Sequence, residues 1–185
     1  MPLAISPRHD LEDFPNGLSH DDKVEVFIAR VEGWLLGPAA EMVAKGVSHR
    51  GFALLMILSS YFEMIAKYKD GFVGEGKSAH YFKQGLLSAF PDLTLPDDAA
   101  FVDQFYSRIR NGLYHAGMTR AGVLLSDDIP GVIAYQPATG LIGVSPDRLA
   151  QALRAHFATY ENDLRLGLNS DVRGKFERRF DSDNA

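Results

Sequence analysis

Three residues with chemically active side chains, Arg110, Asn111 and His115, lie within one stretch of the chain, residues 101–119. Arginine carries a planar, permanently charged fork of donors that suits a phosphate. Histidine can take up and release a proton near neutral pH. Asn111 could orient His115, because residues four apart lie on the same side of a helix. Together these groups could cleave a phosphodiester without a metal, since histidine moves protons and arginine stabilises the charge that develops.

The stretch 101–119 is predicted to be a helix, because its apolar residues recur at helical spacing. This apolar face consists of Phe101, Val102, Phe105, Ile109, Gly112, Leu113 and Ala116. The opposite face is polar and extends the candidate site. Tyr114, four residues after Arg110, could contact a phosphate or a base. Asp103 and Ser107 continue the same edge and could hold Arg110 in place.

The spacing of Arg110 and His115 conflicts with a site inside one helix. Five residues of a regular helix correspond to a rotation of about 140°, so the two side chains point apart. Either Gly112 relaxes the helix, or the two groups converge only across a dimer in which both copies face a shared cleft.

The pattern Arg110-Asn111-x-x-x-His115 resembles the signature of HEPN-domain proteins, in which an arginine, often followed by Asn, Asp or His, precedes a histidine by a short spacer. The resemblance extends over roughly residues 21–167. It implies a small helical bundle, commonly dimeric, that acts as a metal-independent ribonuclease in toxin–antitoxin, phage-defence or RNA-processing systems. Other members are non-catalytic binding or scaffold modules. The resemblance also favours the dimer, which would place two arginines and two histidines around one RNA strand.

Glu63 is the exceptional residue of a helix that is expected over residues 50–68 and is apolar nearly all round. A carboxylate among apolar neighbours costs several kcal/mol unless it is paired or protonated. Arg110 is the attractive partner, because an ion pair would tie this central helix to the motif helix. The alternative is that Glu63 lies on a wetted edge and reaches solvent.

The fold class expected is mainly α: an up-and-down bundle of four to five helices. A small antiparallel β insert, at about residues 121–144, precedes the last helix. The first helix is expected to be interrupted at Gly37-Pro38, because proline removes a donor and clashes with the preceding turn. Its inward residues are predicted to be Val24, Phe27, Ile28, Val31, Trp34 and Leu35. Residues 1–20 are expected to form an irregular arm, residues 21–168 the helical domain, and residues 169–185 a polar, solvated tail.

Composition limits the class of protein. A chain of 185 residues with 46% hydrophobic content can form one domain with a real core. It has no cysteine, which excludes disulfides and thiolate chemistry, and its other histidines show no ligand spacing, so no metal and no cofactor are expected. The N-terminus lacks signal-peptide features and the longest apolar run, Gly51–Leu58, is too short to cross a bilayer. We therefore expect a cytoplasmic protein without a membrane partner.

The net charge of −5 argues against a protein that coats nucleic acid through bulk electrostatics. A local basic site remains compatible with this charge, and a dimer would double it. Two functions follow. The first is a metal-independent endoribonuclease, with RNA as substrate and an antitoxin or other protein as partner. The second is a non-catalytic dimeric module in which Arg110 pairs with Glu63. A basic cleft between two copies of Arg110 favours the enzyme, and a motif sealed by Glu63 and aromatic side chains favours the module.

Overall fold

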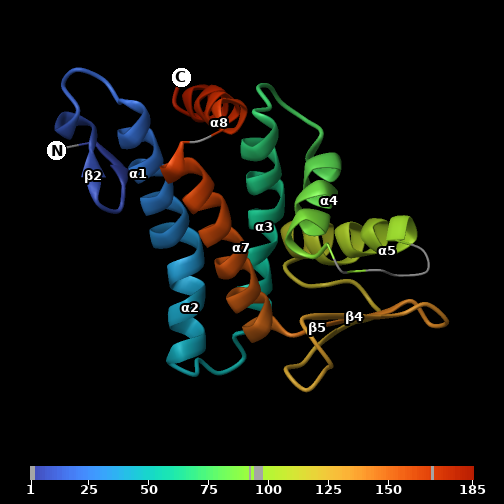
Figure 1. The fold of residues 1–185 in the computed structure, drawn as a ribbon. Coiled ribbons are helices and arrows are strands. Elements are labelled where there is room, and N and C mark those ends of the chain that lie inside the picture. Colours follow the sequence, from blue (N-terminus) through green and yellow to red (C-terminus); the bar gives the residue numbers. More distant parts are fainter. Residues whose placement is uncertain (1–2, 92, 94–97, 168) are drawn as a thin grey trace.

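The computed structural model describes residues 3–91, 93, 98–167 and 169–185. Within these residues the chain is mainly helical, as the sequence predicts, and it has two small sheets where the sequence predicted one. Helix α7 lies beside both α1 and α3, α4 packs along α3, and α5 lies close to the three-stranded sheet (Figure 1). The helices are α1 (His20–Val31), α2 (Gly37–Ala44), α3 (Gly51–Asp70), α4 (Ser78–Ala89), α5 (Asp98–Phe105), α6 (Asn111–Ala116), α7 (Pro146–Leu166) and α8 (Ser170–Asp183). The strands are β1 (Ala4–Ser6), β2 (His9–Asp10), β3 (Val123–Leu125), β4 (Ile133–Gln136) and β5 (Leu141–Val144), and the short helical turns are η1 (Leu11–Asp13), η2 (Glu32–Leu36) and η3 (Tyr106–Arg110).

Helix α3 lies at the centre of the bundle, as its apolar composition predicts. Its residues Leu54, Leu58 and Phe62 are completely buried. Helix α4 approaches it closely at Gly85, where a Cβ atom would lie 1.9 Å from the backbone oxygen of Phe62. Only glycine therefore permits this contact between the two helices.

An interruption at Gly37-Pro38 was predicted, but the helix continues from α1 into α2 through the π-helical turn η2. In this turn the Gly37 N–H bonds to the Glu32 carbonyl, five residues back. Pro38 then falls at the start of α2, where its missing donor is tolerated. The wider turn changes which residues face the core. Leu36 is buried, whereas Trp34, which was predicted to face inward, is 57% exposed.

The β insert is not the antiparallel meander that the sequence suggested. The strand order is β3-β5-β4, with β4 antiparallel to β5 but β3 parallel to β5. The segment between β3 and β4 explains the difference, because it crosses the end of β5 and is fastened there. Ser145 N–H donates to the Val132 carbonyl at 2.9 Å, and the Ser145 hydroxyl donates to Asp127 at 2.6 Å.

The N-terminal arm is more regular than predicted. Strands β1 and β2 pair in an antiparallel hairpin, and α1 already begins at His20. Arg30 on α1 donates from Nε to the Ile5 carbonyl at 2.6 Å, and Ile5 packs against the core. The hairpin is therefore attached to the bundle.

The predicted polar, solvated tail is instead helix α8, packed across the ends of α1 and α3 (Figure 1). Phe176 and Phe180, four residues apart, form its inner face and are 0% and 1% exposed. Gly71, at the end of α3, permits the approach, since a Cβ there would lie 2.8 Å from the Lys175 backbone. The tail was misjudged because its charged residues outnumber the two aromatic anchors.

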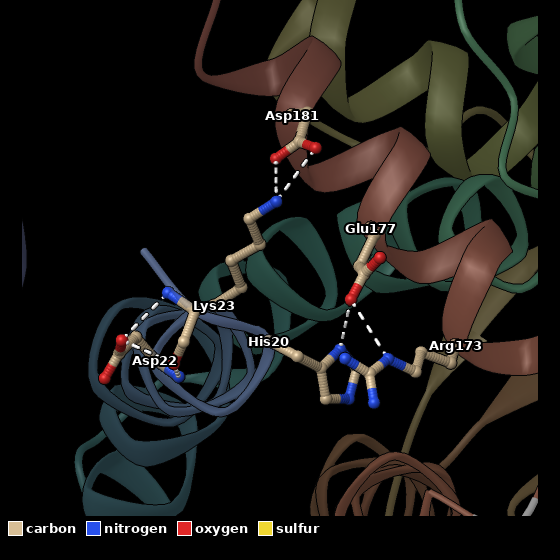
Figure 2. A network of polar contacts seen from close by, with 7 residues as sticks. His20, Asp22, Lys23, Arg173, Glu177 and Asp181 are labelled. Atoms are coloured by element: carbon tan, nitrogen blue, oxygen red, sulfur yellow. Dashed lines mark hydrogen bonds and ion pairs between the residues drawn. The ribbon is translucent and has the colours of Figure 1, made fainter. Parts of the chain in front are cut away.

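An ion pair from Lys23 and a hydrogen bond from His20 also fasten α1 to α8 (Figure 2). Lys23 Nζ lies 2.6 Å from the Asp181 carboxylate. His20 Nδ1 lies 2.7 Å from Glu177 Oε1, an oxygen that Arg173 contacts as well. In the described part of the chain no helix is long and apolar enough to span a membrane.

Candidate functional site

Arg110 is positioned by a second π-helical turn, η3, between α5 and α6. Here the Asn111 N–H bonds to the Tyr106 carbonyl. The helix therefore departs from regular geometry in the turn that ends at Arg110. One of the two alternatives placed this departure at Gly112, and there the helix is regular. Such turns within α-helices often occur at functional sites.

Gly112 has a different function, because the chain folds back over it after α6. Gly117 ends α6 in the left-handed conformation, with φ of 72°. A Cβ on Gly112 would lie 2.7 Å from the Met118 carbonyl oxygen. The returning chain is held by the Arg120 N–H, which donates to the Arg108 carbonyl at 2.9 Å. Gly112 thus allows the segment after the motif to pack against α6.

The guanidinium of Arg110 lies between two tyrosine rings on its own helix. Its central carbon is 4.7 Å from the ring centre of Tyr114 and 5.7 Å from that of Tyr106. Tyr106 is four residues before Arg110 and Tyr114 four residues after it, so both rings lie on the same side. Cation–π contacts of this kind contribute about 0.5–1 kcal/mol each at exposed sites. They fix the plane of the guanidinium.

The donors of Arg110 reach two other helices. Nη2 donates to the Ser78 hydroxyl at 3.1 Å and lies 3.6 Å from Glu63 Oε2. Nη1 donates to the Asn111 side-chain oxygen at 3.3 Å. The predicted pair of Arg110 and Glu63 is therefore present. Ser78, at the start of α4, was not predicted to take part.

Glu63 also binds Lys67 and Ser78. Lys67 Nζ lies 2.6 Å from Glu63 Oε1, and the Ser78 hydroxyl donates to Glu63 Oε2. Burial acts to raise the pKa of Glu63, but the hydrogen bonds from Lys67 and Ser78 and the charges of Lys67 and Arg110 outweigh it and hold the pKa below its ordinary value. Glu63 is thus a partly buried carboxylate, 21% exposed, that keeps its charge.

A pocket of about 250 Å³ opens beside this cluster, where α3, α6 and α8 meet. Lys67, Arg110 and Arg179 contribute positive charge to its wall, and Glu63 and Asp183 contribute negative charge. Tyr114 forms part of the rim and is 50% exposed. Helix α8 thus completes the pocket, which the sequence could not show because nothing in it relates residues 179–183 to the motif.

His115, the other predicted catalytic residue, is in the last turn of α6 and is exposed. It is not among the residues that line the pocket. In the ranges that the structure describes, His115 makes no hydrogen bond, ion pair or ring contact. Asn111 was expected to orient it, but the Asn111 side-chain oxygen accepts from Arg110 instead. Since α6 is regular from Asn111 onward, His115 and Arg110 diverge within one chain.

The predicted support from Asp103 and Ser107 is also absent from the described contacts of Arg110. Asp103 pairs with Lys83 on α4, and the Ser107 hydroxyl donates to the Gln104 carbonyl at 3.3 Å. Tyr106 contacts Arg110 directly, and Lys67 binds Glu63, the partner of Arg110. Both could have been found from sequence spacing alone, because Tyr106 is four residues from Arg110 and Lys67 four residues from Glu63.

A second histidine, His156 on α7, belongs to a separate polar cluster. Its Nδ1 lies 2.7 Å from the Tyr61 hydroxyl, and its Nε2 lies 3.2 Å from both Ser88 Oγ and Lys69 Nζ. Burial, together with the charge of Lys69, lowers the pKa of His156 to about 4. His156 is therefore neutral at pH 7 and fixed by its neighbours.

No group of three or more His, Cys, Asp or Glu side chains that could hold a metal ion occurs among the residues with described positions. The groups present at the motif are arginine, lysine and tyrosine side chains, the carboxylate of Glu63 and the exposed His115. Comparison of the chain with protein-family models, with curated proteins and with solved structures finds no match.

Proposed function

We propose that this chain is a metal-independent endoribonuclease of HEPN type, acting as a homodimer with Arg110 and His115 as its catalytic residues. The observation that carries the proposal is the placement of Arg110, whose charge is fixed in a pocket wall while an exposed histidine follows in the next helical turn. The resemblance of the motif to HEPN proteins supports a cytoplasmic toxin or defence component that an antitoxin or another protein controls.

The reaction requires three events. His115 takes the proton of the RNA 2′-hydroxyl, whose oxygen then attacks the adjacent phosphorus. The additional negative charge on the phosphate is stabilised by the guanidinium of Arg110, which lies in the wall of the pocket. The bond to the 5′-oxygen breaks, and a protonated histidine supplies the proton to that oxygen. The products are a 2′,3′-cyclic phosphate and a free 5′-hydroxyl, and no metal takes part.

The second copy of the chain is needed because Arg110 and His115 diverge within one helix. A face suited to the contact runs along α3. Phe52 and Met56 are 46% and 39% exposed, and with Ser60 they form a stripe at four-residue spacing that leads to the pocket. A second copy that covers Phe52 and Met56 would remove their apolar surface from water, which favours association. A two-fold contact along this stripe would bring two motifs to one cleft.

A second function, a non-catalytic dimeric binding module, is favoured by one specific observation. Arg110 already has partners in Glu63 and Ser78, and these bonds stabilise the junction of α3, α4 and α6. In such a module the pocket would bind an anion without transforming it.

Cleavage of mixed RNA by the purified protein in EDTA separates these functions. Wild type is compared with Arg110→Ala and His115→Ala, and with His80→Ala and Arg178→Ala as controls, because both control residues are exposed helical residues outside the pocket. We expect metal-free cleavage that is lost only in the two motif variants and yields cyclic phosphate ends. Absence of cleavage by wild type, combined with a lower melting temperature of Arg110→Ala, would contradict the nuclease and support the module.

A further inference from the structure

The pocket at the motif continues into a second depression along the bundle. This second depression has a volume of about 260 Å³ and is lined mainly by apolar groups of α1, η2 and α3, among them Val31 and Leu35. Both depressions are lined by Met64, Tyr68 and Asp183. The two depressions therefore adjoin, and together they are here called the α3–α8 groove, with Leu35 at one end, Met64 in the middle and Arg110 at the other end.

The net charge of the residues that line this groove is opposite in sign to the net charge of the whole chain. Arg30, Lys67, Arg110 and Arg179 line it, against two carboxylates, Glu63 and Asp183. The groove is thus positive overall, whereas the chain carries −5. A positive surface on an acidic protein selects a polyanion locally, because attraction from the rest of the surface is absent.

Helix α8 holds Arg179 in this groove. Arg179 Nη1 donates to the Phe72 carbonyl at 3.0 Å, and Nε donates to Asp183 at 3.0 Å. Asp183 also accepts a hydrogen bond from Tyr68, which connects α8 to the floor of the groove. The guanidinium is therefore pre-positioned, so little side-chain entropy is lost when it meets a ligand.

The shape of the groove favours an extended ligand over an enclosed small molecule. Both depressions are open to solvent and lie one after the other along the bundle, so they offer an elongated surface and not an enclosed cavity. The half-exposed ring of Tyr114 at one end offers a stacking surface for a base, and Met64 and Leu35 offer apolar surface for a base or ribose. Aromatic and apolar surface beside a cationic track is the pattern of single-stranded nucleic-acid binding.

We propose that single-stranded RNA reaches the motif along the α3–α8 groove, with one phosphate at Arg110, the next nucleotides over Met64, and Arg179 as a binding residue contributed by α8. The proposal rests on the proposed function of the same site and adds the path of the strand. It also assigns a role in RNA binding to the C-terminal helix.

The test uses fluorescence anisotropy with a labelled single-stranded RNA that carries 2′-O-methyl groups, because this RNA cannot be cleaved through its 2′-oxygen. Arg179→Ala is compared with Arg178→Ala, the exposed neighbour on the same helix. We expect Arg179→Ala to weaken binding by about tenfold and to reduce the salt slope by about 1, because one phosphate contact is lost. Arg178→Ala should stay within about twofold of wild type, as its side chain lies outside the groove.

A second variant guards against loss of folding. Met64→Glu introduces a negative charge at a partly exposed position in the middle of the groove, and we expect it to weaken binding by about tenfold as well. Thermal melting confirms that each variant is folded. If the folded Arg179→Ala and Met64→Glu variants bind RNA as wild type does, the proposal that RNA follows the groove is wrong. It is also wrong if wild type prefers poly-glutamate to RNA.

Cleavage of unmodified RNA is measured in parallel and separates the two proposals. Cleavage that needs Arg110 and His115 but is unaffected by Met64→Glu would support the ribonuclease function and contradict RNA binding along the groove. Binding that depends on Arg179 and Met64, without cleavage, would support RNA binding along the groove and contradict the ribonuclease function.

Discussion

The surroundings of the two histidines His115 and His156 are opposite in character. His156 is held by Tyr61, Ser88 and Lys69, and its pKa is lowered to about 4. His115 is exposed at the end of a short helix and makes no hydrogen bond, ion pair or ring contact among the described residues. His156 is therefore neutral at pH 7, because burial and the charge of Lys69 lower its pKa.

Under the proposed function, one histidine would serve stability and the other the reaction. A network such as that of His156 fixes a side chain and stabilises the junction of α3, α4 and α7. A catalytic histidine must instead be accessible to its substrate, and its orientation can come from a second copy of the chain or from RNA. The single chain would then hold the arginine of the site ready and leave the histidine free until the complex forms.

The largest expected effects come from exchanging the two histidines for alanine. His115→Ala should lower metal-free RNA cleavage by about 10²–10⁴-fold, the usual contribution of acid–base catalysis, and leave the melting temperature unchanged. His156→Ala should do the reverse. It leaves the buried Tyr61 hydroxyl without its partner, so the free energy of unfolding should fall by about 1–3 kcal/mol while cleavage persists. Urea unfolding measures the free energy of unfolding, and single-turnover cleavage measures activity. Equal losses of activity in the two variants would contradict separate roles for the two histidines.

The pH dependence of stability should identify His156. Its pKa in the folded protein, about 4, lies below the ordinary value of 6.5, so the unfolded chain binds the proton first. The contribution of His156 is therefore fully present above pH 6.5 and is lost as the pH falls toward 4. We expect a loss of up to about 2 kcal/mol over this window, reduced by partial exposure, and a flatter profile for His156→Gln. Urea unfolding at several pH values checks this, and an unchanged slope in the variant would assign the titration to another group.

The smallest expected effect comes from changing Glu63, the carboxylate that pairs with Arg110. Glu63→Gln keeps the shape of the side chain but removes the charge that pairs with Lys67 and Arg110. Stability should fall by about 1 kcal/mol at pH 7, because two cations then lack their carboxylate. Binding of the uncleavable RNA should become a few-fold tighter, since Arg110 is freed for phosphate. Weaker RNA binding by the folded variant would mean that Glu63 positions Arg110 for the ligand.

Most of what could be predicted from the sequence came from apolar residues at helical spacing. The central position of α3 follows from its apolar composition, and the pair of Glu63 with Arg110 follows from the one carboxylate among those apolar residues. The parallel pairing of β3 with β5 could not be predicted, because it depends on a crossing segment anchored by Ser145. The wall of the pocket formed by α8 depends on contacts between residues about a hundred positions apart, such as Arg179 with the Phe72 carbonyl, and no local pattern records these.

The π-helical turn η3 has a consequence for aligning this chain with related sequences. A helix can absorb one additional residue by widening a single turn, and the core positions on both sides are then retained. Phe105 before the turn and Leu113 after it are 0% and 1% exposed, so the buried face continues across it. A relative without the additional residue would differ by a one-residue deletion inside the helix, between Phe105 and Arg110. An alignment that allows gaps only in loops would then shift the motif arginine by one position and miss the correspondence.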